Sequence, residues 1–150
     1  MKRLLCVLML CASIVSVVQA GWLTSWVIDQ FMRYNIRYST PMVDSNGNTY
    51  IQANFTTKYK NTFCVLVYPD TDCIFFSQRT TSYSLFVENA VYAAACFGAD
   101  DMVRLAVAAL GSSGQYADDG ILYAYFDYYD YTYYTNFLSG SGWINLLIRP

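Results

Sequence analysis

The sequence contains no histidine, and Glu88 is its single glutamate. Histidine carries protons at neutral pH and is the commonest nitrogen ligand for zinc and copper. Its absence excludes Ser-His-Asp and Cys-His catalysis and His-dependent ribonuclease chemistry. A hydrolase would therefore need a pair of carboxylates. In glycoside cleavage, one of the two must lie in an apolar setting that raises its pKa, and no acidic residue of this sequence has such a setting. We therefore expect a protein that is not an enzyme and has no cofactor.

Charged residues are also scarce, at 13% of the chain against 18% aromatic residues. Disordered chains show the opposite balance, so the composition indicates a packed domain. The basic residues that follow the first three positions stand singly, whereas nucleic-acid binding requires a basic face that displaces counterions from phosphates. We expect no nucleic-acid partner and no attraction to anionic membrane surfaces.

The first twenty residues have the pattern of a secretory signal peptide. Two basic residues precede an apolar run over residues 4–18, and residues 18–20 (Val-Gln-Ala) have the small-x-small shape of a cleavage site. The run is too short for a membrane span. We expect residues 1–20 to be removed and residues 21–150 to form a single secreted, extracellular domain. Seven basic and eleven acidic residues then remain, which is a net charge of −4.

Hydrophobic periodicity divides the rest of the chain into helices and strands. Helical patterns cover residues 22–34, 83–97 and 100–110, and strand patterns cover residues 50–59, 63–68, 73–78, 121–134 and 143–148. Thr24 or Ser25, Ser84 and Asp100 are the expected helix caps. This order predicts an α+β fold: a single two-layer domain in which an antiparallel sheet packs against a helical hairpin and an N-terminal helix. The sheet comprises a three-stranded meander plus C-terminal strands.

Turn chemistry predicts how the meander strands are aligned. A two-residue turn at Lys60-Asn61 would place Phe55 opposite Leu66. A four-residue turn that begins with proline would then place Tyr68 opposite Cys73.

Three cysteines follow the leader, Cys64, Cys73 and Cys96, and export implies an oxidising compartment in which one disulfide is expected. In the predicted alignment Cys64 and Cys73 share a face but lie about 13 Å apart along the strands. A disulfide requires a Cα separation of about 4.4–6.8 Å, so we expect Cys96 to pair with one of the other two. The remaining thiol is buried or links two chains in a disulfide-linked dimer.

Asn54-Phe55-Thr56 is an N-glycosylation sequon. Asn54 falls on the polar side of its predicted strand, in a chain expected to be exported. We therefore expect a glycoprotein that carries its glycan at Asn54.

Residues 121–134 hold seven of the fifteen tyrosines. Acidic neighbours suit tyrosine sulfation, and the same phenols could cross-link as dityrosine or stack against sugars or peptides. The β-propensity of the segment predicts a strand or a hairpin. The alternative to a binding role is a two-sided strand whose rings fill a core on one side and shield the sheet on the other. The candidate binding residues are Tyr123, Tyr125, Tyr128, Tyr129, Tyr131, Asp127 and Asp130.

The other acidic residues predict no metal site. Residues 44–48 begin like a calcium loop, but the glycine comes too early and Phe55 stands where the bidentate acid belongs. The acidic pairs at positions 70 and 72, 100 and 101, and 118 and 119 fit turn and cap roles.

These observations predict a small secreted, tyrosine-rich, non-enzymatic protein that acts through an aromatic and acidic surface as a binding or interaction module. Its partner would be an extracellular protein, a glycan or a matrix. The alternative is a structural component of an extracellular matrix of the shell, eggshell or cuticle type, in which tyrosine and aspartate cross-link or contact mineral. A third is a carboxylate-dependent hydrolase.

Overall fold

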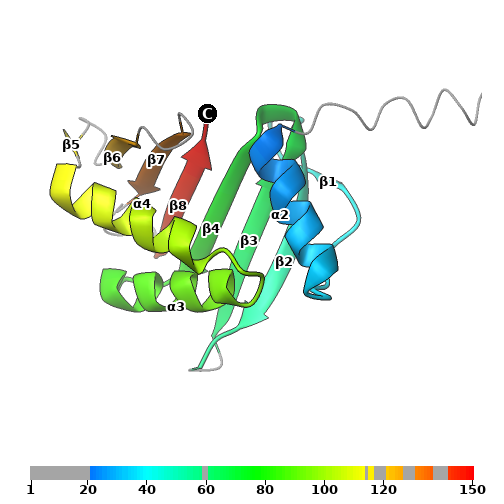
Figure 1. Ribbon diagram of the computed structural model, residues 1–150, viewed down its shortest axis with the longest axis horizontal. Coiled ribbons are helices and arrows are strands. Elements are labelled where there is room, and N and C mark those ends of the chain that lie inside the picture. Colours follow the sequence, from blue (N-terminus) through cyan, green and yellow to red (C-terminus); the bar gives the residue numbers. More distant parts are fainter. Residues whose placement is uncertain (1–20, 59–60, 114, 117–120, 127–130, 137–141) are drawn as a thin grey trace, which may run out of the picture.

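The computed structural model describes residues 21–58, 61–113, 115–116, 121–126, 131–136 and 142–150. Its eight-stranded antiparallel sheet has the order β1-β2-β3-β4-β8-β7-β6-β5, and the helices of the described chain lie together on one side of that sheet (Figure 1). The strands are β1 (Met42–Val43), β2 (Thr49–Thr56), β3 (Thr62–Tyr68), β4 (Cys73–Arg79), β5 (Gln115–Tyr116), β6 (Ile121–Phe126), β7 (Tyr131–Asn136) and β8 (Trp143–Arg149). The helices are α2 (Trp22–Arg33), α3 (Tyr83–Ala95), α4 (Asp100–Ser113) and the 3-10 helix η1 (Pro69–Thr71). The predicted α+β domain is confirmed.

The meander β2-β3-β4 forms because its strands alternate between buried and more exposed side chains. In β3 the side chains of Phe63, Val65 and Val67 are fully buried, whereas the residues between them are half-buried. A period of two places the buried set on one face of the sheet, toward the helices.

The predicted alignment of β3 and β4 is confirmed, since Tyr68 pairs with Cys73. Pro69 begins the connecting turn and Asp72 closes it with a left-handed φ of 51°. Turn chemistry of this kind is visible in the sequence because proline fixes its own φ and aspartate tolerates the left-handed region.

The predicted alignment of β2 and β3 is wrong, because Phe55 pairs with Phe63 and not with Leu66. The backbone N–H of Thr57 donates to the carbonyl of Asn61 (2.9 Å), and the Thr57 hydroxyl accepts from the Asn61 N–H (3.2 Å). The connection therefore starts at Thr57 and is longer than two residues. Lys60, which the predicted turn included, lies outside the described residues.

The last strand in chain order lies inside the sheet, where β8 is hydrogen-bonded between β4 and β7 (Figure 1). Ile148 stands opposite Ile74 of β4 on one side and Tyr133 of β7 on the other. The side chains of Ile144, Leu146 and Ile148 are buried on the helix side. Strand β8 thus joins the meander to the β6–β7 hairpin.

Helices α3 and α4 form the expected hairpin. The hydroxyl of Ser82 accepts from the backbone N–H of Leu85 (3.3 Å), so Ser82 is the N-cap, and Ser84, the expected cap, lies inside the first turn. Gly98 adopts a φ of 72° between the helices, a conformation that glycine reaches without steric cost. None of the described helices has both the length and the apolar character needed to cross a membrane.

Helix α2 is capped by a residue from a distant turn. Gly21 occupies the N-cap position but has no side chain, and the Asp72 carboxylate takes that role. Its Oδ1 accepts from the backbone N–H of Thr24 (2.9 Å) and from the Thr24 hydroxyl (2.9 Å). Thr24 and Ser25, the expected caps, lie inside the helix.

Phenylalanine rings join the helices to the sheet in the core. The ring of Phe97, just after α3, packs edge-on against Phe31 of α2, with centroids 4.9 Å apart. The same ring stacks on Phe76 of β4 at 6.5 Å. All three side chains are fully buried, so α2, α3 and the sheet share one core.

Candidate interaction surface

The side of the sheet that faces away from the helices is the candidate site, and we call it the open face. The β2 and β3 positions on it are Tyr50, Gln52, Asn54, Thr56, Thr62, Cys64, Leu66 and Tyr68. The β4 and β8 positions on it are Cys73, Phe75, Ser77, Arg79, Trp143, Asn145, Leu147 and Arg149. Helices α2, α3 and α4 lie on the other side of the sheet (Figure 1).

Apolar and aromatic side chains run across the middle of the open face. The rings of Tyr50 and Tyr68 stack with centroids 5.3 Å apart, and Tyr68 meets Phe75 edge-on at 5.4 Å. Phe75 also stands opposite Leu66 on one neighbouring strand and opposite Leu147 on the other. All five side chains are half-buried, so each retains apolar surface in contact with solvent.

The phenol of Tyr68 stays protonated on this face at physiological pH. Burial raises its pKa, and the nearby negative charge of Asp44 and the Tyr50 phenol raise it further. Tyr68 therefore contributes a neutral hydroxyl to the aromatic cluster.

Polar residues form a second row beside the aromatic one, with Asn54, Cys64, Ser77 and Asn145 on successive strands. The Cys64 thiol donates to Asn54 Oδ1 (3.2 Å), and the Ser77 hydroxyl donates to Asn145 Oδ1 (2.5 Å). These side chains bond to one another across the strands. The row consequently adds polarity to the open face without adding charge.

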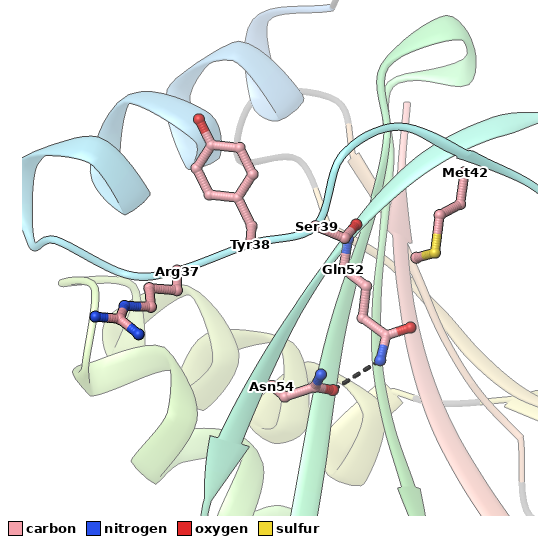
Figure 2. Close-up of a pocket in the computed structure, with 6 residues that line it drawn as sticks. All are labelled: Arg37, Tyr38, Ser39, Met42, Gln52 and Asn54. Carbon is pink, nitrogen blue, oxygen red and sulfur yellow. Dashed lines mark hydrogen bonds between the residues drawn. The ribbon is translucent and has the colours of Figure 1, made fainter.

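An open pocket of about 430 Å³ lies where the chain segment after α2 meets β2 (Figure 2). Ser39 anchors that segment: its backbone N–H donates to the Gln52 carbonyl (2.9 Å) and its hydroxyl accepts from the Gln52 N–H (3.0 Å). Figure 2 shows Tyr38 pointing toward α2, while Gln52 and Asn54 lie side by side on β2. Arg37 and Met42 complete the lining, so the pocket is lined by polar, basic and thioether groups.

Asn54, the residue of the sequon, is exposed at this edge of the open face, and Thr56 is exposed as well. The Asn54 side-chain oxygen accepts from Gln52 Nε2 (2.7 Å) and from the Cys64 thiol. Both bonds use the side-chain oxygen, whereas the amide nitrogen is the atom that carries an N-linked glycan. Glycosylation at Asn54 remains a prediction.

The expected disulfide between Cys96 and the sheet is absent, since Cys64, Cys73 and Cys96 are all free thiols. Cys96 is the C-cap of α3 on the helix side, whereas Cys64 and Cys73 lie on the open face, so the sheet separates them. Burial raises the pKa of the Cys64 and Cys96 thiols, which keeps both protonated at neutral pH. The sequence could not reveal which face of the sheet the helix covers.

The tyrosine segment forms a β-hairpin, one of the two predicted forms. Tyr123 pairs with Tyr134, and Tyr125 with Thr132, while Tyr131 pairs with Phe126. Asp127, Tyr128, Tyr129 and Asp130 lie outside the described residues. Sequence reasoning missed that β7 pairs with β8, so that Tyr134 stands opposite Leu147 and the hairpin continues the sheet that carries the open face.

The calcium-like loop is a tight turn. Asp44 Oδ1 accepts from the backbone N–H groups of Asn46 (2.8 Å) and Asn48 (2.9 Å), and Gly47 takes a φ of 85°. These bonds, the one from the Asn48 N–H above all, lower the pKa of Asp44. In the part of the chain that the structure describes, no three acidic, cysteine or histidine side chains are placed to hold a metal ion.

Comparisons of this chain with protein-family models, with curated proteins and with solved structures found no match.

Proposed function

We propose that the protein is a secreted, non-enzymatic interaction protein that binds an extracellular protein partner through the open face. The observation that carries the proposal is the cluster of five half-buried apolar and aromatic side chains on that face. They are Tyr50, Leu66, Tyr68, Phe75 and Leu147. Contiguous exposed apolar surface rimmed by polar residues is typical of protein–protein contact sites.

The charges of the open face define the chemistry of the partner. Its positions on β2, β3, β4 and β8 include no carboxylate, and their charged side chains, Arg79 and Arg149, lie at opposite ends of β4 and β8. The complementary surface is therefore an uncharged, apolar patch on a protein, with amide or hydroxyl groups at its edge. Because screening by salt acts on charges, the affinity should change little with ionic strength.

The tyrosine hairpin extends this surface. Strands β6 and β7 continue the sheet beyond β8, so Tyr123 and Tyr125 belong to a hairpin that adjoins the apolar cluster. By register, Tyr131 is two positions from Tyr133, which pairs with Ile148 of the helix side. Tyrosine supplies contact area and a hydrogen-bonding tip at low entropy cost.

Export is the first part of the proposal to test. The full chain is expressed in a secreting eukaryotic cell line, and the medium is analysed by intact mass and N-terminal sequencing. We expect protein in the medium that begins at Gly21 and carries a glycan that Thr56→Ala removes. Protein that keeps Met1 and stays inside the cells would contradict export.

Binding is measured with the biotin-labelled secreted protein and the extracellular fraction of the source tissue. We expect saturable binding that excess unlabelled protein displaces, that 50 and 500 mM NaCl leave unchanged, and that protease treatment of the fraction abolishes. Leu66→Lys and Phe75→Lys should each weaken binding by about thirtyfold, the effect of a central interface residue.

The matched control is Leu105→Lys, which places the same charge on an exposed leucine of α4, on the other side of the sheet. Circular dichroism and urea unfolding verify that each variant is folded. Equal affinity of all three variants would mean that the partner binds a surface other than the open face. A protein that denaturant alone extracts from the tissue would instead favour the structural matrix component.

A further inference from the structure

Signal-peptide removal would change the chemistry of Gly21, the N-cap residue of α2, and this inference rests on the export proposed above. Cleavage after Ala20 converts the backbone nitrogen of Gly21 from a neutral amide into a positively charged α-ammonium group. We propose that the Asp72 carboxylate binds this ammonium group. The mature protein would then hold an ion pair, between its own first residue and the β3–β4 turn, that the precursor cannot form.

The position of the Asp72 carboxylate carries the argument. A Cβ atom built on Gly21 would lie 1.9 Å from Asp72 Cγ and 2.3 Å from Asp72 Oδ1. The carboxylate thus occupies the space of the missing N-cap side chain, and it also bonds the Thr24 N–H as such a side chain would. Because Cβ and N of one residue are roughly 2.5 Å apart, Oδ1 lies within about 4.8 Å of the Gly21 nitrogen.

Helix electrostatics explain why the mature chain needs a carboxylate at this place. The unpaired N–H groups of a helix N-terminus carry partial positive charge, so an α-ammonium group at the N-cap is repelled by its own helix. Helix α2 has no acidic residue in its first turn. Asp72, which lies between η1 and β4 in the chain, supplies the negative charge that the first turn of α2 lacks.

Charge also strengthens the contact itself. Hydrogen bonds between ionised groups are roughly twice as strong as neutral ones. Removal of the signal peptide would therefore strengthen the contact between α2 and the β3–β4 turn. We expect the folding equilibrium constant to be about fivefold larger with a free Gly21 ammonium than with a capped one.

The test is a double cycle on the secreted protein. The α-amine of Gly21 is left free or capped with an aldehyde reagent selective for N-terminal amines, in the wild-type protein and in Asp72→Asn. Asparagine keeps an acceptor for the Thr24 N–H but removes the charge. Steric effects of the cap occur in both backgrounds and cancel, so the difference between them isolates the ion pair.

We expect capping to lower the folding equilibrium constant about fivefold more in the wild type than in Asp72→Asn. Asp70→Asn, on the same turn and exposed, is the matched control and should behave as the wild type. A second readout needs no variant: at pH 7.5 the Gly21 amine should react more slowly with an acylating reagent in the native protein than in urea.

Equal capping effects in the two backgrounds, or equal acylation rates in native and unfolded protein, would overturn the ion pair and leave export intact. Exported protein that begins at a residue other than Gly21 would do the same. Retention of Met1 inside the cell overturns both proposals, and N-terminal sequencing separates these outcomes.

Discussion

Asn89 of α3 donates its side-chain amide to the side-chain carbonyl of Gln78 on β4, 3.1 Å away, and both residues are 1% exposed. The pair is a polar contact inside the hydrophobic interface between the helix layer and the sheet. Gln78 Nε2 is buried there and has no hydrogen-bond partner among the described residues. One bond therefore offsets only part of the cost of burying two amides.

Asn89→Ala should lower the free energy of unfolding by about 1–3 kcal/mol, because it leaves the Gln78 carbonyl buried without its donor. The double variant Gln78→Leu with Asn89→Leu should lie within about 1 kcal/mol of the wild type, or above it, since it removes both amides together. Urea unfolding gives both values. Glu88→Ala, on the exposed neighbour, is the control. If the double variant were as unstable as Asn89→Ala, the two side-chain amides would stabilise the folded state by more than the single hydrogen bond between them.

The cap of α2 predicts a rescue. Gly21→Ser should destabilise the protein by about 1–3 kcal/mol, because its Cβ overlaps the Asp72 carboxyl group. Asp72→Gly, in which glycine adopts the left-handed φ of residue 72 without strain, should alone cost about 0.5–2 kcal/mol through loss of the cap. Combined, the two substitutions relieve the overlap and let the serine hydroxyl cap Thr24, so most of the stability returns. Thermal unfolding of the three variants measures the coupling, and additive losses would argue against a carboxylate in the N-cap position.

The Asp44 turn should respond to acid in one direction. Hydrogen bonds, led by the Asn48 N–H, lower the pKa of Asp44 in the folded state. The turn is therefore stabilised above the ordinary aspartate pKa, and this contribution is lost as the pH falls through the lower folded value. We expect the NMR amide signals of Asn46 and Asn48 to titrate below the ordinary aspartate range, and Asp44→Asn to abolish the titration. A midpoint at or above that range would contradict the turn geometry.

The sequence predicted correctly the strand alignment that depends on turn residues close together in the chain. The β3–β4 alignment followed from Pro69 and Asp72, whose turn preferences act within a few residues. The β2–β3 alignment did not, because the Thr57–Asn61 connection lacks the glycine that would specify a tight turn. Cys96 was assigned to a disulfide by elimination, while its true position depends on which face of the sheet α3 covers.

The candidate surface was predicted only in part. The tyrosine segment stands out by composition, and it forms a hairpin, one of the two forms predicted for it, whereas its role in binding stays a prediction. The cluster of Tyr50, Tyr68 and Phe75 was missed, because each lies on a different strand and the rings meet through strand pairing. The pairing of Asp72 with α2 was missed for a similar reason, since 48 residues separate Asp72 from Thr24.

The place of β8 between β4 and β7 determines when the sheet can be completed. During synthesis the meander and the helical hairpin emerge first, but the β4 edge has no partner until residues 143–149 have left the ribosome. An unpaired edge of this kind recruits strands from other chains. At about 5–20 residues per second, the interval from β4 to β8 leaves that edge open for several seconds. Nascent chains are therefore most prone to aggregate in this interval, and premature termination before residue 143 would leave the edge permanently unpaired.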